Sequence, residues 1–120
     1  MKSVQFVDSS ETLCVGKIVC LGRNYAEHAK EMMSDIPQTP VIFLKPSTAL
    51  IAEGMDIVIP PFSADVHHEV ELVMVIGRSG KNIPSSIALE YVKGYGIGLD
   101  MTLRDVQNEA KKKGLPWSVA

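Results

Sequence analysis

Two glutamates, Glu69 and Glu71, stand two positions apart in an otherwise apolar run that extends to Ile76. The run alternates like a β-strand, and alternate side chains of a strand point to opposite faces. Both carboxylates therefore share one face, with their Cα atoms about 7 Å apart. Val73 and Val75 continue that face, which indicates that it is covered. Like charges are costly to bury together unless a proton or a cation lies between them, so the pattern predicts a divalent metal ion.

Two other structures could account for the run around Glu69: a half-exposed β-sheet and a zinc-protease helix. A half-exposed sheet whose glutamates face water would show the same alternation. His68 and Glu69 resemble the start of a zinc-protease helix, but the second histidine of that motif would fall at Leu72, and the period is that of a strand. A zinc protease is therefore excluded. We expect His67 and His68 to pack or to support the site, because Mg²⁺ and Mn²⁺ prefer oxygen ligands.

A third carboxylate, Asp100, follows the predicted strand Val92–Leu99. An Asp in front of a helix is commonly a cap or turn residue. Together with Glu69 and Glu71, however, it would provide three oxygen ligands and leave positions for water and a bidentate substrate. Mg²⁺, which gives up its water reluctantly, accepts such a set.

His28 and Glu31 form a second candidate group, on a helix predicted from about Tyr25 to Met33. A spacing of three places both side chains on one helix face. Glu31 could then orient His28 as a general base. An exposed polar helix face accounts for an isolated pair of this kind as well.

The elements that must position these groups are mainly strands, with short helices between them. Strands are predicted by apolar runs that end at Gly, Pro or polar clusters, and helices by a cap residue followed by a helical period. The predicted strands are Val4–Val7, Lys17–Leu21, Val41–Lys45, His67–Ile76 and Val92–Leu99, with a hairpin of Ala49–Ile51 and Ile57–Ile59 around Gly54. The predicted helices are Tyr25–Met33, Ser86–Tyr91 and Leu103–Lys113, the last capped by Thr102 and ended by Gly114.

The composition is that of a globular domain. The 120 residues are 46% hydrophobic and 22% charged, and 12 Lys+Arg against 14 Asp+Glu give a net charge of -2, so neither nucleic acid nor an anionic membrane surface is an expected partner. No apolar run approaches the roughly 20 residues that span a bilayer, and no apolar signal region follows Met1. Cys14 and Cys20 are too few for a disulfide scaffold. We therefore expect a cytoplasmic protein with reduced thiols.

Five segments together resemble the fumarylacetoacetate hydrolase family, in its short branch of acylpyruvate hydrolases and oxaloacetate decarboxylases or tautomerases. They follow the order and spacing of that family over nearly the whole chain. The segments are Gly22–His28, Phe43–Ser47, His68–Leu72, Gly94–Thr102 with Arg104-Asp105, and Lys113–Trp117.

The resemblance implies an α+β, mainly β fold, a mixed β-roll with short peripheral helices, usually in a homodimer. It implies that Glu69, Glu71 and Asp100 hold Mg²⁺ or Mn²⁺. Members of this branch run to about twice this length and continue after Trp117 with a lysine that contacts the substrate. We therefore expect residues 1–120 to be the N-terminal portion of one catalytic domain that is truncated at its C-terminal end.

The same resemblance implies that His28 and Glu31 order over the substrate as a lid. It assigns Lys45, Arg104 and Gln107 to the surroundings of a small 2-oxo acid, where the first two offer a carboxylate its charged partners.

The implied reaction is metal-dependent hydrolysis of a carbon-carbon bond in acylpyruvate-type 2,4-dioxo acids, giving pyruvate and a carboxylic acid, with His28 activating water. The alternatives are an oxaloacetate decarboxylase or tautomerase, or a 2-oxo acid isomerase or decarboxylase of an aromatic degradation pathway. A metal-stabilised domain without catalysis is an alternative of a different class.

Overall fold

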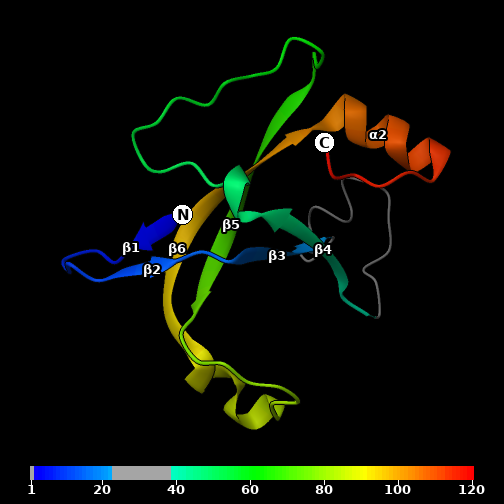
Figure 1. Cartoon of the computed structure of the whole chain (residues 1–120). Coiled ribbons are helices and arrows are strands. Elements are labelled where there is room, and N and C mark those ends of the chain that lie inside the picture. The colour runs from blue at the N-terminus through cyan, green and yellow to red at the C-terminus, as the bar shows by residue number, and fades with distance from the viewer. Residues whose placement is uncertain (1, 23–38) are drawn as a thin grey trace. The chain divides into compact units, whose positions relative to one another are not determined.

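A computed structural model describes residues 2–22 and 39–120 of the chain (Figure 1). The chain divides into two compact units, Met1–Ile57 and Val58–Ala120. The predicted helix Tyr25–Met33, with His28 and Glu31, lies outside the described residues. Within the described ranges, none of the helices has both the length and the apolar character that crossing a bilayer requires.

The first unit contains two small antiparallel sheets. Strand β1 (Ser3–Gln5) pairs with β2 (Thr12–Cys14), and β3 (Lys17–Gly22) pairs with β4 (Val41–Pro46). Exposure alternates strictly along β3 and β4, as in strands with one shielded face. The two predicted strands of this pair are therefore confirmed.

The hairpin predicted around Gly54 is wrong. Its first half begins in the 3-10 helix η1 (Ser47–Ala49), and no strand is assigned between Leu50 and Ile59. The turn itself forms, because Gly54 adopts a φ of 78° and the Met55 amide donates to the Ala52 carbonyl oxygen.

The second unit is built on one long antiparallel hairpin (Figure 1). Strand β5 (Val66–Ile76) pairs with β6 (Val92–Leu103), and the 3-10 helix η2 (Ser85–Tyr91) lies in the connection. The predicted carboxylate strand is confirmed. Its partner runs four residues beyond the predicted end at Leu99, because the residues up to Leu103 continue to pair with the start of β5.

Helix α2 (Arg104–Lys113) follows β6 without a loop. Gly114 ends it in the left-handed conformation at φ 65°, and its amide donates to the Ala110 and Lys111 carbonyl oxygens, as predicted. The predicted Thr102 cap is wrong. Thr102 lies inside β6, where its hydroxyl donates to the Asp100 carbonyl oxygen at 3.3 Å, and the helix start has no side-chain cap.

The best-shielded part of the second unit is the junction of β6 and α2. Among the described residues, only Thr102, Arg104 and Ala110 are less than 9% exposed. In contrast, the hairpin face that points away from the two glutamates is apolar and exposed. Its members are Val70, Leu72, Met74 and Ile76 of β5 and Tyr95, Ile97 and Leu99 of β6.

Candidate metal centre

The three candidate metal ligands lie on one face of the β5–β6 hairpin. Glu69 pairs in register with Asp100, and Glu71 pairs with Gly98. Side chains that are directly opposite in an antiparallel pair point to the same side, with Cβ atoms about 4.5–5.5 Å apart. All three carboxylates are half-buried, and the Oδ1 atom of Asp100 is buried. The expectation that Asp100 stands at a strand end is wrong, since β6 continues to Leu103.

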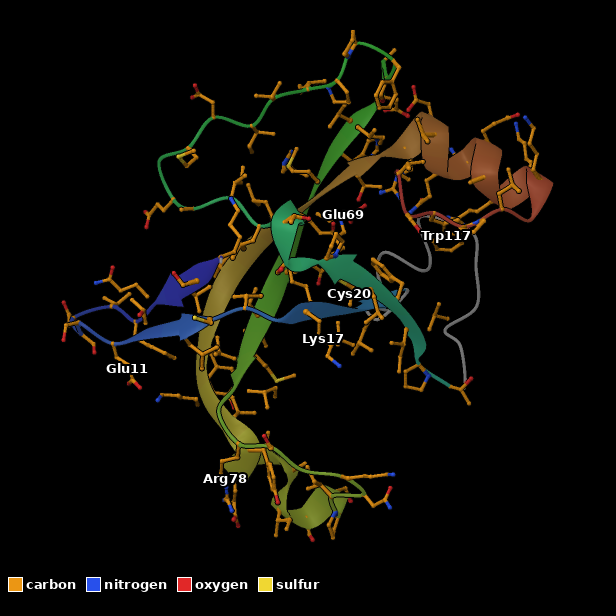
Figure 2. All side chains as sticks on the ribbon, in the orientation of Figure 1. Glu11, Lys17, Cys20, Glu69, Arg78 and Trp117 are labelled. Carbon is orange, nitrogen blue, oxygen red and sulfur yellow. The ribbon has the colours of Figure 1, made fainter. Side chains whose placement is uncertain are left out.

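Arg104 is the cation beside these carboxylates. Arg104 is the first residue of α2, and its amide donates to the carbonyl oxygen of Asp65, in the loop before β5, at 2.8 Å. Its Nη2 donates to Oε1 of Glu69, and its Nη1 donates to Oε1 of Gln107 at 2.8 Å. The Arg104 side chain is 10% exposed and that of Glu69 is 24% exposed. Figure 2 shows Glu69 on β5 near the α2 end of the hairpin.

This cluster fits a hard divalent cation in donor type, in common face and in charge. Three carboxylates and one guanidinium give a formal charge of -2, which a divalent ion would neutralise. In the described part of the chain, however, no three His, Cys, Asp or Glu side chains converge as a ligand set. Oε1 of Glu69, which accepts from Arg104, is not available to a cation while this ion pair persists.

Glycines line the rest of the carboxylate face. Gly98 and Gly96 pair with Glu71 and Val73, and Gly94 pairs with Val75. A Cβ atom at Gly98 would lie 2.9 Å from Cγ2 of Val73, which is closer than side-chain atoms approach one another. The glycines at positions 94, 96 and 98 therefore keep the β6 part of this face free of side chains opposite Glu71, Val73 and Val75.

Asp105 fastens the loop before β5 to the start of α2. Its Oδ1 accepts a hydrogen bond from the Ser63 hydroxyl at 2.7 Å, and its Oδ2 accepts one from the Ala64 amide at 2.9 Å. These bonds, from Ser63 first and Ala64 second, hold the pKa of the Asp105 carboxyl below its usual value of 3.8. Because Arg104 is the neighbouring residue, this clamp helps to fix the guanidinium beside Glu69.

Replacing Asp105 by Asn is expected to destabilise the protein at neutral pH. A carboxyl whose pKa is lowered on folding contributes stability above its unfolded pKa, and that stability is lost as the pH falls through the folded pKa. The melting temperatures of wild type and Asp105→Asn should therefore differ at about pH 7 and converge below about pH 3.8. Asp56→Asn, which changes an exposed carboxylate, is the control. A constant difference down to about pH 2 would contradict this role.

Of the predicted substrate residues, Arg104 and Gln107 lie with the carboxylates. Lys45 lies in β4 of the first unit, and His28 and Glu31 lie outside the described residues. Arg104, Gln107 and Lys111 form a line along α2, since Nζ of Lys111 donates to Oε1 of Gln107 at 3.1 Å.

Lys111 is a member of this polar line that was not predicted from the sequence. Its Nζ lies 4.8 Å from the centre of the Trp117 ring, so it joins the line to the C-terminal segment. The spacings of three and four between Arg104, Gln107 and Lys111 were the available signal, because such residues share one helix face.

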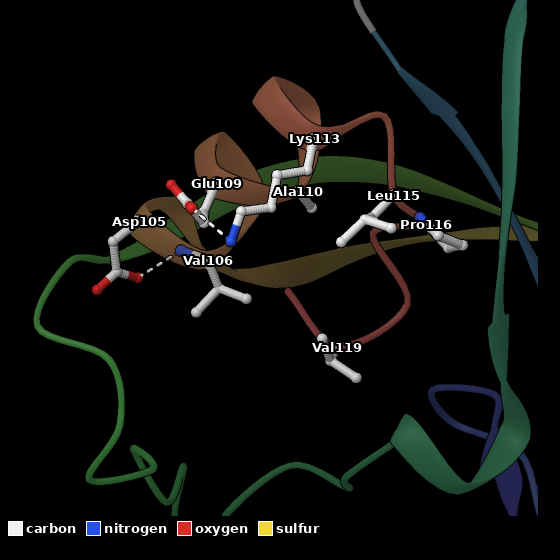
Figure 3. A pocket seen from close by; sticks show the side chains of 8 residues that line it. All are labelled: Asp105, Val106, Glu109, Ala110, Lys113, Leu115, Pro116 and Val119. Atoms are coloured by element: carbon white, nitrogen blue, oxygen red, sulfur yellow. Dashed lines mark hydrogen bonds and ion pairs between the residues drawn. The ribbon is translucent and has the colours of Figure 1, made fainter.

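A separate groove of about 400 Å³ lies between α2 and the C-terminal segment (Figure 3). Apolar side chains form most of its wall, and the Glu109–Lys113 ion pair, at 2.8 Å, lies along it. Its lining residues are Asp105, Val106, Glu109, Ala110, Lys113, Leu115, Pro116 and Val119. The groove contains none of the predicted site residues.

Comparison with known proteins gives a consistent result. A family model described as fumarylacetoacetate (FAA) hydrolase C-terminal matches residues 17–120. The chain is 55% identical over 103 residues to a protein of Rattus norvegicus named oxaloacetate tautomerase FAHD1, mitochondrial, and 53% identical over 104 residues to the Arabidopsis thaliana protein of the same name. These matches cover 86% and 87% of this chain and 47% of each relative, so the chain spans about half the length of these relatives.

Solved structures agree with the fold. The crystal structure of fumarylpyruvate hydrolase from Pseudomonas aeruginosa in complex with Mn²⁺ and pyruvate matches with a TM-score of 0.91 at 38% identity, over 98% of this chain and 53% of that one. A structure described as a fumarylacetoacetate isomerase/hydrolase from Oleispira antarctica matches with a TM-score of 0.82 at 45% identity, over 88% of this chain and 47% of that one. The mainly β, α+β fold class and the family resemblance are thereby confirmed.

Proposed function

Because this chain belongs to the fumarylacetoacetate hydrolase family, we propose that it acts as a metal-dependent enzyme. The proposed reaction is hydrolysis of a carbon-carbon bond in acylpyruvate-type 2,4-dioxo acids. The products would be pyruvate and a carboxylic acid. The observation that carries the proposal is the set of Glu69, Glu71 and Asp100 on one face of the hairpin, beside the guanidinium of Arg104. The fumarylpyruvate hydrolase structure, which holds Mn²⁺ and pyruvate, supports both the metal and the substrate class.

The residues proposed to hold Mg²⁺ or Mn²⁺ are the three carboxylates. When bound, the ion would supply a Lewis acid for the substrate's 2-oxo group. Arg104, whose Nη1 donates to Gln107, would pair with the carboxylate of the 2-oxo acid. Lys45 is proposed as a substrate-binding residue from the family resemblance alone.

His28, oriented by Glu31, would act as the general base. Its imidazole would take a proton from water as the water attacks the distal carbonyl carbon, and the bond to the pyruvate carbon would then break. The proton would return from the imidazole to that pyruvate carbon. No nucleophile from the protein is needed in this scheme.

A second candidate function is oxaloacetate tautomerisation or decarboxylation. The relatives in Rattus norvegicus and Arabidopsis thaliana, at 55% and 53% identity, carry the name oxaloacetate tautomerase, which favours this candidate. It would use the same metal site and the same anion partners, but it needs no attacking water. An isomerase or decarboxylase acting on another 2-oxo acid would share these features.

The proposed oligomeric state and cellular location of the protein come from its sequence and family resemblance. We propose a homodimer that acts on a small 2-oxo acid in the cytoplasm, with neither nucleic acid nor membrane as a partner. The relatives named above are described as mitochondrial, so the location of this protein stays a prediction.

An NMR time course separates the candidate reactions. Protein expressed from its whole gene should convert acetylpyruvate to acetate and pyruvate when Mg²⁺ or Mn²⁺ is present, and should stop when EDTA is added. Turnover of oxaloacetate but not of acetylpyruvate would replace the hydrolase proposal by the tautomerase or decarboxylase. Turnover of neither compound would contradict both.

A further inference from the structure

Glu69 is the one candidate ligand whose carboxylate is paired with Arg104 in the described part of the chain. The guanidinium reaches it from α2, 35 residues further along the chain. Both side chains are shielded from water, so their attraction is stronger than that of a surface ion pair. Removing Glu69 from this pair would therefore cost free energy.

The guanidinium cannot follow Glu69 into a metal site. Arg104 is fixed by its backbone hydrogen bond to the Asp65 carbonyl oxygen and by its Nη1 bond to Gln107. It also carries a positive charge, which a cation beside Glu71 and Asp100 would repel. A cation beside Glu71 and Asp100 would therefore compete with the guanidinium for Oε1 of Glu69, the oxygen that accepts from Arg104.

We propose that Arg104 competes with the metal ion for Glu69. In this exchange Glu69 leaves the guanidinium when it joins Glu71 and Asp100 around the cation. The inference rests on the proposed metal site, and it adds a coupling: metal binding releases Arg104 from its ion pair.

The exchange would also leave the guanidinium of Arg104 able to bind an anion. Arg104 remains held by Gln107, whose Oε1 also accepts from Lys111. Its Nη2, released by Glu69, would then face the site with an unused donor. An anion is expected to bind there more tightly after the metal has bound than before.

Replacing Arg104 by Met tests the competition, because the direction of the change in Mn²⁺ affinity depends on whether Arg104 opposes or supports metal binding. A charged hydrogen bond of this kind corresponds to about a tenfold to hundredfold change in an equilibrium constant, so Arg104→Met should bind Mn²⁺ about tenfold to a hundredfold more tightly than wild type. The measurement is Mn²⁺ titration of the protein expressed from its whole gene, followed by the EPR signal of free Mn²⁺. Arg104→Lys keeps the charge but loses the planar fork, so its affinity should lie between the two.

The matched control is Arg78→Met, at the other end of the hairpin from Glu69 (Figure 2). Arg78 forms an exposed pair with Glu90 at 3.9 Å and stacks on Tyr91, so its loss should leave Mn²⁺ affinity unchanged. If Arg104 only supported Glu69 as a ligand, Arg104→Met would instead bind Mn²⁺ about tenfold to a hundredfold more weakly.

The outcomes distinguish the inference from the proposed function. A wild-type protein that binds Mn²⁺ while Arg104→Met and Arg104→Lys bind it equally or more weakly would overturn the competition alone. A wild-type protein that binds no Mn²⁺ would overturn the metal site and the competition together. Should Arg104→Met fail to fold, the affinity of Arg104→Lys relative to wild type decides the sign.

Discussion

Glu71→Gln is expected to abolish turnover and metal binding together. The substitution keeps the shape of the side chain and removes one anionic oxygen ligand from the hairpin face. Because a bound metal contributes several kcal/mol to transition-state stabilisation, turnover of the 2-oxo acid substrate should fall about 1000-fold or more. Glu71 is a better choice than Glu69, whose replacement would also break the ion pair with Arg104.

Glu90→Gln is the control for this experiment. Glu90 is an exposed carboxylate in η2, 3.9 Å from Arg78, and its replacement should leave turnover and Mn²⁺ affinity unchanged. If the metal were only structural, Glu71→Gln would lose its fold, which far-UV circular dichroism would show. A folded Glu71→Gln variant with wild-type Mn²⁺ affinity would contradict the proposed ligand set.

The second large effect is expected for His28→Asn. A positioned general base contributes about 100-fold to 10,000-fold, so hydrolysis of acetylpyruvate should slow by that factor while Mn²⁺ affinity stays unchanged. The measurement is kcat for acetylpyruvate together with a Mn²⁺ titration of the same preparation. Glu31→Gln should show a smaller loss, since Glu31 only orients the imidazole in this account.

His68→Asn is the matched control for the base. His68 pairs with Met101 in register, so its side chain lies on the hairpin face opposite to that of Glu69. Its replacement should leave hydrolysis unchanged. Acetylpyruvate hydrolysis at the wild-type rate in His28→Asn would remove His28 from the mechanism.

Local sequence patterns predicted several strands and the last helix of the fold. Apolar runs that end at Gly22 and Pro46 predicted β3 and β4. Alternation predicted β5, because successive side chains of a strand point to opposite faces. The helical period and the glycine at position 114 predicted α2 and its end. These features depend on residues that are close in the chain, which is why the sequence reveals them.

Features that depend on distant residues were not predictable in this way. Asp100 was expected at a strand end, but pairing with Glu69, 31 positions away by their numbers, keeps it inside β6. The Thr102 cap failed because the pairing of β6 with β5 continues through Thr102 to Leu103. Without this register, the sequence shows that Glu69 and Glu71 share a face but not that Asp100 lies on the same face.

The ion pair between Arg104 and Glu69 is the clearest example of a long-range contact that the sequence did not predict. Arg104 was assigned to the substrate by resemblance, whereas its guanidinium contacts Glu69 from 35 residues away. The clamp between Asp105 and Ser63 spans 42 residues. Nothing in the local sequence of α2 indicates either contact, because both arise where the helix start meets the beginning of the hairpin.

The most direct test of the metal centre is the position of Mn²⁺ in crystals of the protein expressed from its whole gene. We predict one anomalous difference peak on the hairpin face, with an oxygen of Glu69, of Glu71 and of Asp100 each within about 2.0–2.6 Å of it. The Glu69 carboxylate should then have left Arg104. Saturating Mn²⁺ with no peak at these three carboxylates would contradict the account.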